Sequence, residues 1–398
     1  MREDSVLENV SIYQEVRAGL TALEGKNLYR RLRALEENRG TRAVWEGRKL
    51  LLFCSNDYLG LSRHPRVVCA AKKALDRYGV GAGAARLISG STDVHEALEK
   101  KIARFKNKEN ALVFGSGFLA NLGILTAFAE EGDTIIMDKL CHASLVDGAR
   151  LSKAELRVFP HRNYAKCENL LKKCPGRRKI LVTESVFSMD GDLADLGQII
   201  RLRKKYGALL VVDDAHGTGV LGKEGRGATE GFSEGVDLVM GTLSKAAGGL
   251  GGFVAADKVL VDHLINFARP FVFATALPPV LCAAAAEAFT VMEEEPGIRE
   301  KLRENIRKVH EGLTRLGFSL ASPDSAILPV VLGDEGKALA AFEFLLSKGI
   351  YIPAVRYPTV PKGKARLRVT VSAAHTATEI DALIDAFAAL GERDGKNP

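Results

Sequence analysis

The sequence predicts an α/β protein built on a mostly parallel sheet, with a second, smaller α/β domain at its carboxyl end. Seven short apolar runs between residues 111 and 256 alternate with segments of helical length and period. The runs are continuously apolar, which is typical of strands covered by helices on both faces. A chain of 398 residues is also long enough for a large core and one or two domains. We therefore expect a seven-stranded sheet in which every strand is buried.

The elements follow one another in a regular order. A helical pattern in the first fifty residues predicts an arm or cover (1–50), and the seven strands then define a large domain (51–277). Pro278 and Pro279 break the chain before a long charged helix over about 280–316. The runs ILPVVL, IYIPAV and RLRVTVS then predict a small α/β domain (278–398). The seven predicted strands are ALVF (111–114), TIIMD (134–138), LRVF (156–159), KILVTE (179–184), ALLVVD (208–213), VDLVMG (236–241) and GFVAA (252–256).

Composition excludes several classes of protein. With 46% hydrophobic and 26% charged residues, the chain is neither disordered nor fibrous. The start MREDSVLENV has no apolar core of a signal peptide, and the most apolar stretch is interrupted by Pro278, Pro279 and Glu287 before it reaches the ~20 residues of a membrane span. We expect neither secretion nor a transmembrane helix.

Cysteine usage and charge indicate the cellular compartment and the kind of ligand. The six cysteines are scattered without a CxxC pair, as in reduced, cytoplasmic proteins. The formal charge of +7 is spread along the chain and interleaved with acids, which does not favour nucleic-acid binding. A mild attraction for small anions is the better use of this charge.

Polar side chains gather just after the predicted strands, where ligands sit in doubly wound sheets. The first strand runs into GSGFLAN, a glycine-flanked turn whose N–H groups at Gly117 and Phe118 open a helix and suit a phosphate. Later strands are followed by other groups that carry chemistry. These are His142, Ser188, Asp213, His216, Thr242 and Lys245.

Each of these residues alone has an ordinary explanation. An aspartate at a strand end usually caps a turn, and Asp214 fits that role; a loop histidine is usually hydrogen-bonded, and a lysine is usually solvated. Together they pose a sharper problem, because one ligand must use an amine, a carboxylate, imidazoles and an anion-binding helix start. Pyridoxal 5'-phosphate does so. The set therefore predicts a pyridoxal-phosphate site.

The chemistry assigns a role to each group. Lys245 would form the Schiff base with the aldehyde, and Asp213 would pair with the ring N–H, which lowers the cost of burying its charge. His216 would meet the phenolic oxygen, His142 would stack on the ring, and Thr242 would contact the phosphate. A divalent-metal hydrolase using DDAH and His142 is the rival enzyme, although it leaves Lys245 without a task. A non-enzymatic binding module is the third possibility.

Several long motifs resemble a known group of enzymes. SNDYLGL, GSGFLAN, HASLVDGA, ESVFSMDGD, VVDDAHGTG, TLSK and FATALPP are similar, in this order, to motifs of the α-oxoamine synthases, over about residues 30–385. The resemblance implies fold type I of the pyridoxal-phosphate-dependent transferases. The stretch 354–376 is most similar to members that join L-alanine to a pimeloyl thioester in biotin synthesis. Members that use glycine with an acetyl group, or serine with a long acyl chain, are the alternative.

The resemblance also implies roles for individual residues. Gly117, Phe118, Ser188, His216 and Thr242 match cofactor contacts, while Lys245, His142 and Asp213 match the Schiff-base lysine, the stacking histidine and the ring-nitrogen partner. Thr275 matches a hydroxyl that reaches the phosphate across a homodimer interface. Asn56, Arg356 and Thr359 match substrate contacts, with the amino-acid carboxylate assigned to Arg356, and Arg30 matches a basic residue at the acyl mouth. Ser244 departs from the pattern, since many relatives have glycine there.

Overall fold

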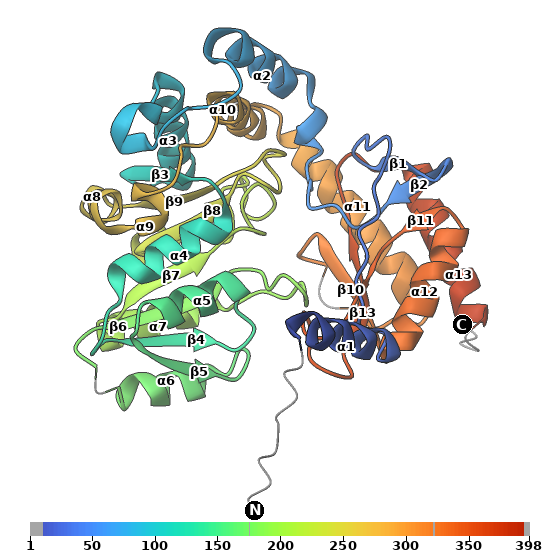
Figure 1. Ribbon diagram of the computed structural model, residues 1–398. Helices are drawn as coiled ribbons and strands as arrows, with labels where there is room; N and C mark the ends of the chain where they lie inside the picture. Colours follow the sequence, from blue (N-terminus) through green and yellow to red (C-terminus); the bar gives the residue numbers. More distant parts are fainter. Residues whose placement is uncertain (1–10, 175, 321–322, 394–398) are drawn as a thin grey trace, which may run out of the picture.

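A computed structural model describes residues 11–174, 176–320 and 323–393, so the first ten residues of the predicted arm lie outside the described part. Its centre is a seven-stranded sheet with the order β3-β9-β8-β7-β6-β4-β5 (Figure 1). Strands β4 to β8 are parallel, and β9 lies antiparallel between β3 and β8. The predicted sheet is confirmed. Its strands are β3 (Asn110–Phe114), β4 (Thr134–Asp138), β5 (Glu155–Phe159), β6 (Lys179–Glu184), β7 (Leu209–Asp213), β8 (Leu238–Thr242) and β9 (Gly252–Ala256).

Helices cover both faces of this sheet, so successive residues of a central strand enter two different cores. In β4, Ile135 and Met137 pack in one core and Ile136 in the other. Strand β5, at one end of the sheet, differs: Val158 is 47% exposed, so the expectation that every strand is buried was wrong there. The surrounding helices are α3 (Asp93–Lys106), α4 (Gly117–Phe128), α5 (Ala143–Leu151), α6 (Tyr164–Lys172), α7 (Leu196–Tyr206), α8 (Lys258–Phe267) and α9 (Arg269–Val272).

Two smaller sheets lie beside the large one. In the first, β10 (Ile327–Gly333), β13 (Ala365–Thr370) and β12 (Ala354–Val355) are antiparallel neighbours. Together with α12 (Glu335–Ser347) and α13 (Ala377–Arg393) they form the smaller α/β unit that the sequence predicts.

The other small sheet combines strands from the N-terminal and C-terminal parts of the chain. Strands β1 (Arg42–Trp45) and β2 (Arg48–Leu52) form a hairpin, and β2 pairs in parallel with β11 (Ile350–Tyr351). Residues 42–50 were predicted to belong to a helical arm, and this was wrong. The turn residues Glu46 and Gly47 both have positive φ, which is typical of a two-residue β-hairpin turn.

The predicted long helix over 280–316 is divided in two. It forms α10 (Pro279–Glu294) and α11 (Pro296–Arg315), because Pro296 has no N–H to continue the first helix and begins the second. Helix α10 packs against α2 (Pro65–Tyr78) and α3, whereas α11 packs against α13. The domain division at residues 50 and 277 stays a prediction.

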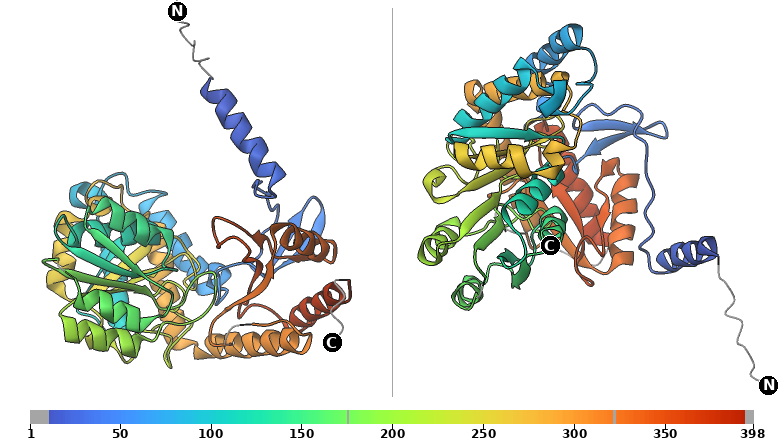
Figure 2. Two further views of the ribbon diagram at one scale, coloured as in Figure 1. Left: turned by 90° about the horizontal axis from the view of Figure 1, so that it is seen from below. Right: turned by 60° about the vertical axis from the view of Figure 1, so that its left-hand side comes forward.

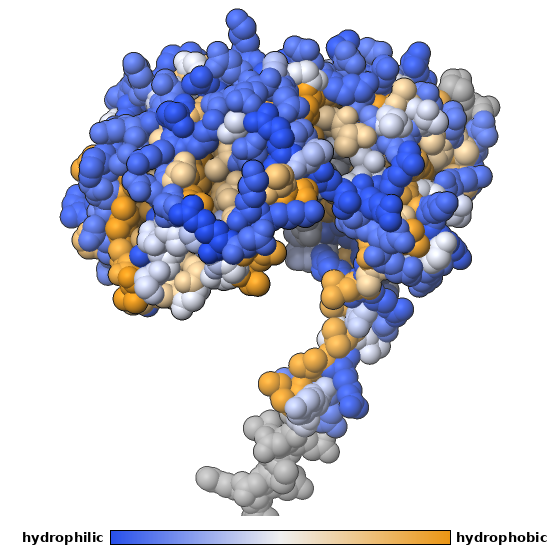
Figure 3. All heavy atoms as spheres, turned by 90° about the horizontal axis from the view of Figure 1, so that it is seen from above, coloured by the Kyte–Doolittle hydropathy of each residue, from blue (hydrophilic) through white to orange (hydrophobic). Residues whose placement is uncertain are grey.

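Helix α1 (Ile12–Gly25) extends away from the rest of the chain (Figure 2) and has no buried residue. Its apolar side chains lie at helical spacing, and an orange stripe follows the arm in Figure 3. The exposed members are Ile12, Tyr13, Val16, Leu20 and Leu23.

The glycine-rich stretch 78–91 includes a short π-helical segment, η2 (Arg86–Gly90). The remaining short segments are the 3₁₀ turns η1 (Leu61–Arg63) and η3 (Ser233–Gly235). Within the described residues, none of the helices has the length and apolar character needed to span a bilayer.

Candidate active site

A cavity of about 230 Å³ lies at the carboxyl ends of the central strands. It is lined by residues that follow β3, β4, β6, β7 and β8, as expected for a doubly wound sheet. Seven of the predicted site residues meet there with seven others. The lining consists of Ser116, Gly117, Phe118, Asn121, His142, Ser144, Glu184, Asp213, Ala215, His216, Met240, Thr242, Ser244 and Lys245.

Lys245 is the amine of this cavity. Its Nζ lies 2.8 Å from Nε2 of His216, whose Nδ1 lies 2.6 Å from the Tyr58 hydroxyl. Burial lowers the pKa of Lys245 to about 8, although the nearby carboxylates of Asp213 and Glu184 oppose the shift. Burial and the charge of Lys245 likewise hold the pKa of His216 well below its usual range. The lysine is therefore close to being a neutral nucleophile near pH 8.

Asp213 is the last residue of β7 and is only 5% exposed. Its two oxygens accept separate hydrogen bonds, from Asn121 Nδ2 at 2.8 Å and from the Ala215 backbone N–H at 3.0 Å. Both donors stabilise the ionised carboxylate, since an anion gains more from them than a neutral acid does. This position can hold a proton on a ligand nitrogen.

The start of α4 also lines the cavity. Ser116 caps the helix by accepting from the Leu119 N–H at 3.2 Å. A Cβ on Gly117 would lie 3.4 Å from Thr242, so glycine keeps this approach open. The rings of Phe118 and His142 are nearly perpendicular, with their centroids 6.2 Å apart. The arrangement offers backbone donors to an anion and an imidazole to a flat ring.

Ser244 forms a local hydrogen-bond pair with the chain at Gly251. Its hydroxyl lies 3.2 Å from both the carbonyl and the N–H of Gly251, while Thr242 Oγ1 donates to the same carbonyl at 2.9 Å. Ser244 thus stabilises the turn that carries Lys245 through hydrogen bonds to Gly251.

The predicted substrate residues lie in two places. Asn56 is near the lysine network, where its Oδ1 accepts from the Tyr58 hydroxyl and from Arg368, both at 3.1 Å. Arg356 instead donates to the Asn27 and Tyr29 carbonyls and lines a different pocket of about 530 Å³.

Near that second pocket lie two further predicted residues. Arg30 donates to the Tyr357 carbonyl at 3.1 Å, and Thr359 folds back by donating its N–H to the Arg356 carbonyl at 3.0 Å. Thr275 is exposed, lies outside the cavity and forms an isolated bridge with Ala85. The roles of Arg30, Arg356, Thr359 and Thr275 stay predictions.

Sequence reasoning missed four residues that the fold brings to the site or next to it. Arg368 is 9% exposed, donates to the Ser188 carbonyl at 2.6 Å and lowers the pKa values of His216 and Lys245. For Arg368 the only signal was a charged residue inside an apolar run, RLRVTVS; for Glu184 it was a carboxylate ending a buried strand. The four are Tyr58, Asn121, Glu184 and Arg368.

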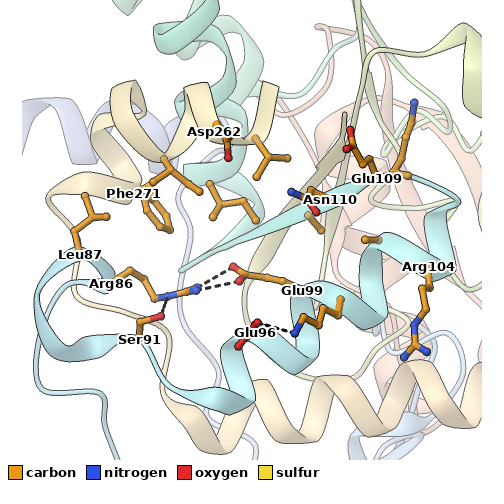
Figure 4. Close-up of a pocket in the computed structure, with 17 residues that line it drawn as sticks. Arg86, Leu87, Ser91, Glu96, Glu99, Arg104, Glu109, Asn110, Asp262 and Phe271 are labelled. Carbon is orange, nitrogen blue, oxygen red and sulfur yellow. Dashed lines mark hydrogen bonds and ion pairs between the residues drawn. The ribbon is translucent and has the colours of Figure 1, made fainter. Parts of the chain in front are cut away.

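A larger cavity, of about 750 Å³, lies elsewhere, along the edge strand β3 (Figure 4). The Arg86 guanidinium pairs there with both oxygens of Glu99, at 2.8 and 3.0 Å, and also donates to Ser91. These groups satisfy one another, and none of the predicted site residues lines this cavity. We therefore place the chemistry in the smaller cavity.

The rival metal site finds no support in the described residues, in which no group of three or more His, Cys, Asp or Glu side chains is arranged to hold a metal ion. In the DDAH motif, Asp214 instead forms an ion pair with Lys106, at 2.7 Å.

Comparison with known proteins gives one family. Residues 48–387 match the aminotransferase class I and II family. A putative 8-amino-7-oxononanoate synthase of Desulforudis audaxviator is 49% identical over 92% of this chain and 96% of that relative, and the 8-amino-7-oxononanoate synthase of Thermoanaerobacter pseudethanolicus is 43% identical over 95% and 97%.

Solved structures agree with this result. Serine palmitoyltransferase of Sphingomonas wittichii has a TM-score of 0.93 at 34% identity and covers 98% of this chain and all of that chain. The 8-amino-7-oxononanoate synthase of Francisella tularensis has a TM-score of 0.75 at 31% identity over 87% of this chain and 98% of that chain. The chain therefore belongs to the aminotransferase class I and II family and, within it, to the α-oxoamine synthases.

Proposed function

We propose that this chain is a pyridoxal-phosphate-dependent acyltransferase that joins L-alanine to a pimeloyl thioester, giving 8-amino-7-oxononanoate, carbon dioxide and a free thiol for biotin synthesis. One observation carries the proposal: Lys245, with a lowered pKa, shares a single cavity with the buried carboxylate of Asp213 in a chain 43–49% identical to such enzymes.

The residues of the cavity fit the cofactor. Lys245 would bind its aldehyde, Asp213 its ring nitrogen, and the start of α4 with Thr242 its phosphate, while His142 would lie on the ring. Pyridoxal 5'-phosphate, when bound, supplies a ring that accepts the electron pair left by a broken bond at the amino-acid Cα. The protein must then hold each partner and move the protons.

Lys245 moves the proton at the reacting carbon. With the cofactor and the amino acid bound, the neutral amine of Lys245 could take the proton from Cα and later return one, since its pKa is lowered to about 8. Asp213 would hold a proton on the ring nitrogen, because its two hydrogen bonds stabilise a carboxylate at this position. His142, at the rim, can donate a hydrogen bond to the acyl oxygen as negative charge develops there.

The amino-acid carboxylate needs a cation, and Arg368 is better placed than Arg356. The Arg368 guanidinium is buried beside Asn56, and its charge lowers the pKa values of His216 and Lys245. Arg356 instead lines the second pocket. Arg356, with Arg30 and Thr359, would instead face the acyl substrate.

Exchanging either arginine for methionine separates these roles. We expect R368M to raise KM for L-alanine about 10- to 100-fold, the loss of one charged hydrogen bond or ion pair. R356M should raise KM for the acyl thioester instead. Steady-state kinetics with each substrate varied in turn measures both values, and the reverse pattern would return the carboxylate to Arg356.

The substrate pair is tested by thiol release. L-alanine, glycine and serine are each combined with pimeloyl, acetyl and palmitoyl thioesters, carried by coenzyme A or acyl carrier protein. We expect the highest kcat/KM for L-alanine with a pimeloyl thioester. A preference for glycine with acetyl, or serine with palmitoyl, would assign the chain to the alternative members of the family. One methyl group changes binding by only ~1–3 kcal/mol, so all combinations are needed.

We also propose that the enzyme is a cytoplasmic homodimer with its site at the interface. The exposed apolar face of α1 needs a covering surface, and Thr275 is itself exposed, so it can meet a second subunit. Sedimentation at micromolar concentration should give about twice the 43.0 kDa mass. A monomer that retains full activity would contradict this arrangement.

A further inference from the structure

Glu184 is a buried carboxyl group in the candidate cavity that the proposed reaction has not used. It is the last residue of β6 and is 2% exposed. Its Oε1 is shielded from solvent and has no hydrogen-bond partner among the described residues. An unpartnered acceptor is costly when ionised, because the lost hydration is not replaced.

Asp213 stands directly beside it. Strands β6 and β7 are parallel neighbours, and Glu184 and Asp213 are partners in register, so their side chains leave the same face of the sheet. Both carboxyl groups line the same cavity. Two buried carboxylates at such neighbouring positions repel each other, so one of them tends to retain a proton.

The hydrogen bonds decide which group holds it. Asp213 accepts from Asn121 and from the Ala215 N–H on separate oxygens, whereas Glu184 leaves one oxygen, Oε1, without a donor among the described residues. The asymmetry favours the anion on Asp213 and the neutral acid on Glu184. We propose that Asp213 and Glu184 act as one pair with a single negative charge, in which Glu184 carries the proton and Asp213 is ionised.

The other charged and titratable groups around Glu184 come from two segments of the chain. Lys245 follows β8, and its charge favours the carboxylate form of Glu184. Cys141 and His142 lie between β4 and α5. The backbone N–H groups of His142 and Ser188 also face the Glu184 carboxyl group. Burial and then the charge of Asp213 nevertheless raise the pKa of Glu184 well above its usual range. This direction agrees with a proton on Glu184.

The consequence, which rests on the proposed function, concerns the charge of the site. With Glu184 neutral, Lys245 and the ring nitrogen face one anion, and that anion is the residue placed to pair with the nitrogen. Glu184 is then a positioning residue, because it acts on the cofactor only through the charge of Asp213.

Infrared difference spectroscopy tests the pair directly. The cofactor-loaded wild type should show the C=O stretch of a protonated carboxyl group from pH 6 to 8, and this band should be missing from E184Q. E379Q is the matched control: burial raises the pKa of Glu379, but the Thr376 N–H and Arg42 lower it overall, so its removal should leave the protonated band intact.

A second variant tests the coupling. In D213N the neighbouring charge is gone, so the band of Glu184 should titrate at least one pH unit lower than in the wild type. A merely structural glutamate would show no such shift. If the wild type lacks the band, or if D213N leaves its titration unchanged, the pair is refuted. Reduction with borohydride in the same samples reports the link at Lys245 separately, so this inference can fail while the proposed function stands.

Discussion

Replacing Lys245 with alanine is expected to reduce kcat by about 10³-fold or more, because the variant loses both the covalent attachment point and the base at Cα. Borohydride treatment of the wild type with pyridoxal 5'-phosphate should leave a reduced adduct on the peptide that contains Lys245, and K245A should show none. Peptide mass spectrometry measures the adduct, and thiol release measures the rate.

The pH dependence of cofactor loading gives this prediction a second readout. The pKa of Lys245 is lowered to about 8, so the neutral amine is the minor form below that pH and the major form above it. The rate at which the cofactor-free protein takes up the aldehyde should therefore rise with pH through about 8 and then level off. Arg368→Met should move this midpoint upward, since Arg368 lowers the lysine pKa. An adduct on another lysine would overturn the assignment.

Replacing Lys106 with methionine is expected to destabilise the protein by about 3–5 kcal/mol, because it leaves a buried carboxylate without its cation. The Lys106 Nζ and Asp214 carboxylate are fully buried and 2.7 Å apart. Nζ also donates to Thr218 and to the Arg226 carbonyl, and the carboxylate accepts from Ser185 as well. Chemical denaturation of the cofactor-free protein measures the loss.

Two controls separate the pair from a general effect of the substitution. The double variant K106M/D214N removes both charges and should recover part of the stability. K258M breaks an exposed pair with Asp262 and should cost less than about 1 kcal/mol. If K106M loses no more unfolding free energy than K258M, the buried pair of Lys106 and Asp214 does not stabilise the fold.

Local patterns in the chain were sufficient to predict the large sheet and the family. Continuous apolar runs were interpreted as buried parallel strands, and all seven form at the predicted places. The edge position of β5 was not predictable, because apolar content does not show how many neighbours a strand has. The division of the long helix at Pro296 and the hairpin at Glu46 and Gly47 were visible in the sequence as a helix breaker and a turn, and were overlooked.

Residues that end strands were also predictable, since parallel strands bring their carboxyl ends to one edge. This rule placed Lys245, Asp213, His216, His142 and Thr242 in one cavity. It could not separate Arg368 from Arg356, since both lie on the same stretch of chain and only the fold decides which one faces the lysine network.

The sequence by itself determined the seven strands of the large sheet, the family and the set of chemical groups available, because these depend on local periodicity and on residues close in the chain. Tertiary structure alone decided which groups became neighbours: Glu184 beside Asp213, Lys106 beneath Asp214, and Arg368 beside Asn56. Those contacts join residues up to 312 positions apart, and their charges and pKa values follow from burial and distance, which no local pattern encodes.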